Sequence, residues 1–157
     1  MNPYTREFYN EIGSAKKAED WAIEVLSDKF RGLHHCELKD SNGDIVDDIG
    51  QKIEVKYDKS SRKTGNVALE ISAYGNSKGL MKSTAKYYFI VCMGVEYYRN
   101  KWIGCLINTN ILRALSSGLE SKWGGDNDAT EMKLAPVSFL IENAERIYQL
   151  SYNKNTA

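Results

Sequence analysis

The sequence predicts an α/β fold with a central mixed β-sheet flanked by helices. Three observations lead to this prediction: a helical stripe of apolar residues near the N-terminus, several short strands after it, and a run rich in Tyr, Phe, Ile and Val over residues 85–93. A run of that length and composition is typical of a fully buried strand. We expect one domain over residues 1–152 and a frayed tail over residues 153–157.

The first element is a predicted helix over residues 5–30, which Gly13 can divide in two. Thr5 can cap its first turn, and acidic residues near that end favour the positive end of the helix dipole. Apolar residues recur at helical spacing, so one face packs inward. That stripe consists of Ala15, Ala18, Ala22, Val25, Leu26 and Phe30.

Alternation and turn signals predict the elements that follow. Helix caps are expected at Asn108 or Thr109 and at Ser138, and Gly118 is expected to end the first of these helices. The expected strands cover 33–39, 44–48, 51–57, 67–74, 85–93 and 101–107, the expected helices cover 111–117 and 138–150, and the expected loops cover 59–66 and 124–128.

Composition narrows the class of protein. The 157 residues include 21 basic and 21 acidic side chains, so the surface is not broadly basic, although a local basic patch is compatible with this balance. No apolar run has membrane-spanning length. Three cysteines, Cys36, Cys92 and Cys105, lie in apolar strings without zinc-site spacing. We therefore expect a cytoplasmic protein with reduced thiols and no membrane partner.

The segment 44–56, DIVDDIGQKIEVK, predicts a β-hairpin with its turn at Ile49-Gly50. If facing residue numbers sum to ninety-eight, Asp44 lies opposite Glu54 and Ile45 lies opposite Ile53. Side chains alternate along a strand, so Lys56 then shares the face of the two carboxylates. A register shift of one residue would invert every one of these assignments.

Two carboxylates placed opposite each other repel, and a bound divalent cation explains why a protein would build such a pair. Carboxylate oxygens suit Mg²⁺, a hard ion that keeps several waters and also binds phosphate oxygens. An adjacent Lys56 can orient or deprotonate an attacking water, or neutralise developing phosphate charge. The chemistry predicted for this hairpin is therefore metal-assisted phosphodiester hydrolysis.

An aspartate, about ten residues and then Glu-x-Lys in a strand resembles the PD-(D/E)XK, or restriction-endonuclease-like, nuclease superfamily. Gly43 stands where that pattern has a proline. The order of elements over residues 10–115 is similar to the superfamily core, and Glu54-Val-Lys-Tyr-Asp58 with Thr64-Gly-Asn66 resembles its small phage-type members. The resemblance implies an endonuclease that acts on DNA with Mg²⁺, or Mn²⁺ in its place. Double-strand cleavage by one active site per chain would require a dimer or higher homo-oligomer.

Further carboxylates are candidates for the same site. Glu19 lies on the inward stripe of the first helix, and in the resembled superfamily a glutamate of this helix often completes the metal site. The alternative is a side chain that reaches solvent beside Lys16. Asp47 and Asp48 are rivals to Asp44, although their place beside the turn favours ordinary turn chemistry. Glu70 either binds metal through a water or faces solvent.

The loop 59–66 is cationic and rich in hydroxyl groups, and we expect its Lys59, Arg62, Lys63 and Asn66 to bind the DNA backbone. A solubilising loop is the alternative. For the whole chain, the alternative function is a catalytically silent nuclease-like module for DNA binding or assembly, and the third is an unrelated α/β protein. The three tyrosine and phenylalanine residues 87–89 are predicted to lie in the core rather than on DNA.

Overall fold

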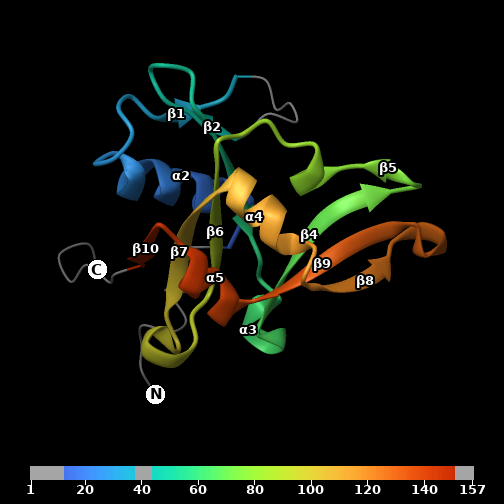
Figure 1. The fold of residues 1–157 in the computed structure, drawn as a ribbon. Coiled ribbons are helices and arrows are strands. Elements are labelled where there is room, and N and C mark those ends of the chain that lie inside the picture. Colours follow the sequence, from blue (N-terminus) through green and yellow to red (C-terminus); the bar gives the residue numbers. More distant parts are fainter. Residues whose placement is uncertain (1–12, 38–43, 151–157) are drawn as a thin grey trace.

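The computed structural model describes residues 13–37 and 44–150 and has an α/β fold with two sheets (Figure 1). Six strands form a mixed sheet in the order β1-β2-β3-β6-β7-β10, and four strands form a second sheet in the order β5-β4-β9-β8. The elements are α2 (Ala15–Leu26), β1 (His34–His35), β2 (Ile45–Val46), β3 (Lys52–Tyr57), α3 (Ser61–Thr64), β4 (Asn66–Ala73), β5 (Asn76–Ser77), η1 (Gly79–Met81), β6 (Tyr87–Met93), η2 (Glu96–Tyr98), β7 (Trp102–Asn108), α4 (Thr109–Ser116), β8 (Glu120–Gly124), η3 (Asp126–Asp128), β9 (Thr130–Pro136), α5 (Val137–Asn143) and β10 (Arg146–Gln149).

Within the described residues, a helix begins just after Gly13, the residue predicted to divide the first helix, and residues 5–12 of the predicted helix lie outside the described residues. Ser14 caps it by accepting the N–H of Lys17 at 3.2 Å, and the helix ends at Leu26 instead of Phe30. Phe30 still reaches the core because the chain turns back after the helix, and its N–H donates to the Leu26 carbonyl. Ala15 is exposed, contrary to the expected stripe, whereas Ala18, Ala22 and Leu26 are buried. The predicted cap Thr5 lies outside the described residues.

The hairpin register predicted from the sequence is confirmed. Ile45 pairs with Ile53 and Val46 with Lys52 in the antiparallel β2–β3 ladder, so facing residue numbers sum to ninety-eight. Strand β3 then pairs in parallel with β6, and β6 pairs antiparallel with β7. This combination makes the sheet mixed, as expected.

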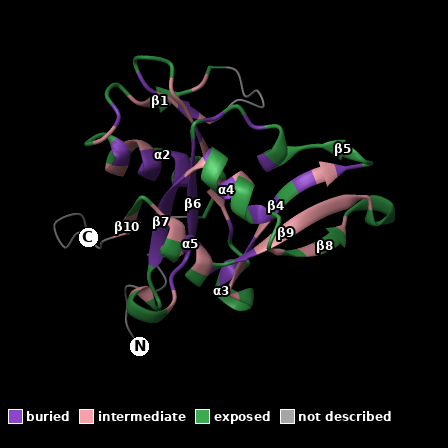
Figure 2. Ribbon diagram, in the orientation of Figure 1, coloured by how far each residue is buried: buried purple, intermediate pink, exposed green. Residues whose placement is uncertain are grey.

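Two apolar layers cover the two faces of the six-stranded sheet. Helix α2 packs on one face against Ile45, Ile53 and Phe89. The other face packs against α4, α5 and the four-stranded sheet, through residues that include Ile90, Leu112 and Leu140. Figure 2 shows the buried strands β6 and β7 running between these layers. Both strands agree closely with their predicted positions, because a strand covered on both faces is apolar throughout.

The four-stranded sheet is absent from the expected fold. The sequence predicts β4 but neither β8 nor β9, and the predicted loop 124–128 is the turn between those two strands. Strand β9 pairs along nearly the whole of β4, with an irregularity between Glu70 and Ser72. Its sequence TEMKLAP contains Glu, Lys, Ala and Pro, which are depleted in strands, so long-range pairing decides its structure.

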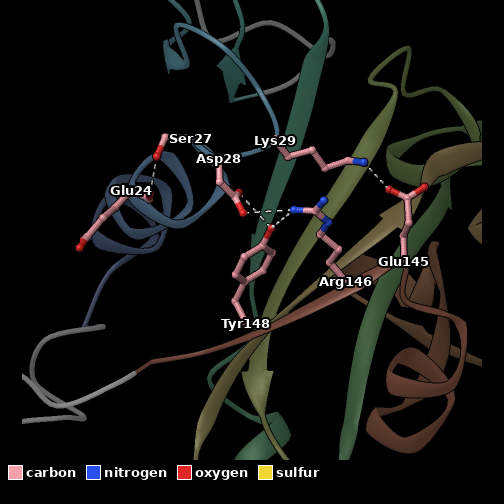
Figure 3. Close-up of polar contacts among 7 residues, drawn as sticks. All are labelled: Glu24, Ser27, Asp28, Lys29, Glu145, Arg146 and Tyr148. Atoms are coloured by element: carbon pink, nitrogen blue, oxygen red, sulfur yellow. Dashed lines mark hydrogen bonds and ion pairs between the residues drawn. The ribbon is translucent and has the colours of Figure 1, made fainter.

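The predicted final helix 138–150 is wrong over its second half. Helix α5 begins at Val137 and ends at Asn143, and β10 follows it and pairs with β7. Side chains of β10 and of Glu145, just before it, also contact the segment after α2 (Figure 3). Arg146 lies 3.2 Å from the Asp28 carboxylate, and Lys29 lies 2.9 Å from Glu145.

The predicted loop 59–66 contains the short helix α3. Asp58 begins this helix by accepting the N–H of Ser61 at 3.0 Å, and its other oxygen accepts the N–H of Ala68 at 3.0 Å. Gly65 ends it in the left-handed region with φ of 72°, which a residue without Cβ adopts readily. The sequence signal that could have indicated this helix is the segment Asp58-Lys59-Ser60-Ser61.

Two further expectations concerned reduced cysteines and the absence of a membrane-spanning segment. The thiols of Cys92 and Cys105 are buried, as predicted, whereas Cys36 is half-buried, and all three are free of disulfides. In the described parts of the chain, every helix is too short or too polar to cross a membrane. The predicted tail 153–157 lies outside the described residues.

Candidate active site

Asp44 directly precedes β2, and Glu54 lies on the neighbouring strand β3, one residue beyond the last residue pair of the β2–β3 ladder. Asp44 donates its backbone N–H at 3.0 Å to the carbonyl of Ile53, the residue that pairs with Ile45, so the regular β2–β3 register ends at Asp44. Its carboxylate oxygen Oδ2 accepts the N–H of Val55 at 2.8 Å. The Asp44 carboxylate is therefore held against the strand that carries Glu54, and both side chains are half-buried.

Glu54 and Lys56 open into a cleft between the two sheets. The cleft has a volume of about 160 Å³. Lys56 follows Glu54 on the same face of β3, about 7 Å further along the strand. The cleft is lined by Glu54, Val55, Lys56, Leu69, Glu70, Gly79, Leu80 and Tyr88.

The wall opposite β3 is made by β4 and η1. Gly79 has a φ of 52°, and a Cβ at this position would lie 2.3 Å from the Glu70 carbonyl oxygen, so η1 can approach β4 only with glycine there. Arg113 of α4 holds the same segment by donating to the carbonyls of Leu80 and Ser83, at 3.1 and 2.7 Å. Glu70 is exposed and is the second carboxylate of the lining, beside Glu54.

The pKa of Tyr88 depends on the charges in and around the cleft. It pairs with Glu54 in the parallel β3–β6 ladder and is 5% exposed. The pKa of Tyr88 is raised to about 12, first by burial and further by the charges of Glu54 and then Asp44. The hydroxyl of Ser83 and the charge of Arg113 act in the opposite direction. The negative charges of both predicted metal ligands therefore reach this buried phenol.

Glu19 lies on the helix that covers the other face of the sheet. Helix α2 packs against Ile53, whereas Glu54 and Lys56 point away from it. Glu19 is 4% exposed, and its carboxylate lies 3.7 Å from Nδ1 of His35. The other ring nitrogen of His35 lies 2.7 Å from Asp20. The role of Glu19 as a metal ligand stays a prediction, and the site described here is built on Asp44 and Glu54.

The rival aspartates lie at the opposite end of the hairpin. Oδ1 of Asp47 accepts the N–H groups of Ile49 and Gln51, at 3.2 and 2.7 Å, so this carboxylate organises the turn. Asp48 is exposed, and its N–H donates to the Arg31 carbonyl. Gly50 has a φ of 84°, which the turn requires. These positions favour Asp44 as the aspartate beside Glu54.

The predicted DNA-binding residues gather around α3, which follows β3 directly. Lys59, Arg62 and Lys63 are exposed. Together with Ser60 they line a surface hollow with a volume of about 450 Å³. Asn66 is half-buried at the start of β4, and its amide donates to the Thr64 carbonyl at 3.4 Å. The three cations therefore form one surface, and Asn66 belongs to the turn behind it.

The donor set fits a magnesium ion better than a metal held by protein alone. In the described ranges, no three His, Cys, Asp or Glu side chains are placed to hold one ion together. Mg²⁺ needs only one or two carboxylates, because waters and substrate phosphates supply its other ligands. Oδ2 of Asp44 accepts the N–H of Val55, and the second oxygen, Oδ1, can serve as such a ligand.

No protein-family model matches the chain, and no curated protein matches it either. Functional inference therefore depends on the geometry of the cleft. That geometry includes Tyr88, Gly79 and Leu80, which the sequence did not place in a site. Their contribution follows from β3 pairing in parallel with β6 and from η1 packing on β4, and neither contact has a local sequence signal.

Proposed function

We propose that this protein is a Mg²⁺-dependent endonuclease that hydrolyses phosphodiester bonds in DNA. The observation that carries the proposal is the hydrogen bond from the N–H of Val55, which lies between Glu54 and Lys56, to the Asp44 carboxylate. This arrangement has the chemical parts of the PD-(D/E)XK pattern on one strand pair. The resemblance is the basis for DNA as the substrate.

Asp44 and Glu54 would hold the magnesium ion, and Glu70 lies close enough to the cleft to bind one of its waters. When bound, the ion supplies Lewis acidity toward a phosphate oxygen and lowers the pKa of its water. The bond from Val55 fixes one oxygen of Asp44, so the carboxylate is oriented before an ion arrives. Such preorganisation lowers the cost of assembling the site.

Lys56 supplies positive charge in the same cleft. Its ammonium can donate to a water that attacks phosphorus or to the phosphate oxygens as their negative charge increases. Leu69, Leu80 and Tyr88 form the apolar part of the lining, which weakens competition from bulk water. Lys56 is therefore assigned to the chemical step, and the two carboxylates to metal binding.

The cations Lys59, Arg62 and Lys63 would bind the sugar-phosphate backbone next to the cleft. They follow β3 immediately, so the strand that carries Glu54 and Lys56 also fixes the position of α3. Phosphate contacts of this kind position a nucleic acid without reading its sequence. Cleavage of both strands would use two copies of the chain, each with one cleft.

A catalytically silent module for DNA binding or assembly is the alternative. Such a module would bind DNA through the same basic surface, but Asp44 and Glu54 would then have no role in metal binding. A direct test is nicking of supercoiled plasmid with Mg²⁺ or with EDTA, by the wild type, Glu54→Gln and Glu142→Gln. Glu142 is exposed on α5 and serves as the matched control.

We expect the wild type and Glu142→Gln to nick the plasmid with Mg²⁺ and not with EDTA, and Glu54→Gln to be inactive. A wild-type protein that binds plasmid but never nicks it, with Mg²⁺ or Mn²⁺ present, would favour the silent module. A protein that neither binds nor nicks DNA would overturn both proposals.

A further inference from the structure

Strand β8 leaves one edge of the four-stranded sheet open. Among the described residues, β8 pairs only with β9, and it is the last strand of the sheet order. Figure 1 shows this sheet projecting away from α2, with β8 along its outer side. Such an edge presents unpaired backbone groups that another strand can bind.

The ladder shows which backbone groups point outward. Val137 donates to Gly65, and Tyr74 donates to the Ala129 carbonyl, so the odd-numbered residues of β9 bond to β4. In an antiparallel ladder the alternate residues bond to the opposite neighbour. The even-numbered residues of β9 therefore bond to Glu120 and Lys122 of β8.

It follows that Ser121 and Trp123 direct their N–H and carbonyl groups to the open side. In the described part of the chain, no backbone hydrogen bond outside the ladders reaches either residue. The Trp123 side chain is also 53% exposed. An edge strand usually protects itself from pairing, and an exposed tryptophan on it does not serve that purpose.

The charges on β8 select one register for pairing with a second copy of the chain. Because only odd-numbered residues point outward, facing numbers in an antiparallel twofold pair must have an even sum. A sum of 240 places Glu120 opposite Glu120, and a sum of 244 places Lys122 opposite Lys122. A sum of 242 places Glu120 opposite Lys122 on both sides of the axis, so only this register pairs opposite charges.

We propose that two copies of this protein associate through β8, antiparallel about a twofold axis at Ser121. Ser121 exchanges both backbone bonds with its counterpart. Trp123 donates to the Leu119 carbonyl of the second copy, whose oxygen also accepts Nζ of Lys133 in its own chain at 3.1 Å and has a second lone pair for this bond. Trp123 then covers Leu119, which is half-buried against the apolar layer between the six-stranded sheet and helices α4 and α5. The four-stranded sheets of the two copies become one continuous sheet.

This interface is independent of the proposed hydrolysis. A single strand pair is smaller than a standard protein interface, so the dimer should dissociate on dilution. Its charge pairs face each other in the closer type of antiparallel pair, where side chains lie nearest, so like charges there should prevent association.

Charge reversal tests the register directly by sedimentation equilibrium. Lys122→Glu leaves only acidic side chains at the interface, and Glu120→Lys leaves only basic ones. We expect the wild type to show a concentration-dependent dimer and each variant alone to have the mass of one chain. An equimolar mixture of the two variants should recover the dimer mass, because the acidic strand of one variant then faces the basic strand of the other at both charge pairs.

Glu142→Lys and Lys101→Glu are matched controls, since both positions are exposed and lie outside β8. Both controls should form the dimer as the wild type does. Recovery in the mixture also shows that both variants are folded. A wild type that stays at the mass of one chain would overturn the proposal, as would single variants that remain dimeric or a mixture that stays monomeric.

Discussion

Oδ2 of Asp44 accepts the backbone N–H of Val55 at 2.8 Å, across the two strands of the hairpin. The bond fixes the aspartate to the strand segment that carries Glu54 and Lys56. It also uses a backbone donor at the end of the short β2–β3 ladder. The predicted site thus depends on the register of one strand pair.

Asp44→Asn should abolish stabilisation by magnesium. In the wild type, metal at about 100 times its Kd adds roughly 2.7 kcal/mol to the free energy of unfolding, and Tm rises accordingly. Asparagine keeps an acceptor for the Val55 N–H but loses the charge that the ion needs. Thermal unfolding with and without Mg²⁺ measures the difference.

Asp48→Asn is the matched control for that measurement, because Asp48 is the rival aspartate and is exposed. It should keep the full increase in Tm. Retention of the increase in Asp44→Asn, with its loss in Asp48→Asn, would exchange the roles of the two residues.

Lys56→Ala should separate cleavage from binding. We expect plasmid cleavage to fall by about 10²-fold or more, as for loss of a group that acts in the chemical step. DNA affinity should change little, since one ammonium is a small part of the phosphate contacts. Lys52→Ala, earlier on the same strand, is the control, and equal losses in both variants would contradict the role of Lys56.

Arg62→Ala combined with Lys63→Ala should weaken DNA binding and leave the site intact. If both residues contact phosphates, the slope of log K against log salt should become shallower by about 2. Fluorescence anisotropy over a salt series measures this slope. Lys16→Ala with Lys17→Ala is the control, because both lysines are exposed on α2. An unchanged slope in the first variant would make α3 a solvated turn.

Ile53→Ala should destabilise the protein by about 2–4 kcal/mol, the usual range for emptying a core position. Ile53 is 0% exposed and packs under α2. Lys52→Ala changes the neighbouring residue on the other face and should cost much less. Urea unfolding gives the free energy of unfolding of both variants. Similar losses in the two variants would mean that burial of Ile53 under α2 contributes little to stability.

Tyr88→Phe should change how stability depends on pH. The pKa of Tyr88 is raised from 10.0 to about 12. Between these values the unfolded chain loses a proton that the native protein keeps, so Tyr88 makes stability decrease as pH rises. The loss is about 2–3 kcal/mol across the window and absent below it. The difference between wild-type and Tyr88→Phe unfolding free energies at several pH values should show this decrease, and a constant difference would contradict it.

The sequence by itself determined the hairpin and the central strands. Alternation at Ile45, Ile53 and Val55 and the turn at Gly50 are local signals, and only one register buries both isoleucines. The apolar runs of β6 and β7 were equally clear, because a strand covered on both faces needs no alternation. These elements fix the positions of Asp44, Glu54 and Lys56.

Tertiary structure alone decided the second sheet, β10 and the cleft. Strands β8 and β9 carry charged residues at many positions and are held by pairing with β4, far away in sequence. The pairing of Glu54 with Tyr88 and the packing of η1 on Glu70 likewise join distant segments. Local periodicity reports which face of a segment is apolar, but not which segment covers it. That choice depends on the free energy of long-range contacts, so the lining of the cleft emerged only from the fold.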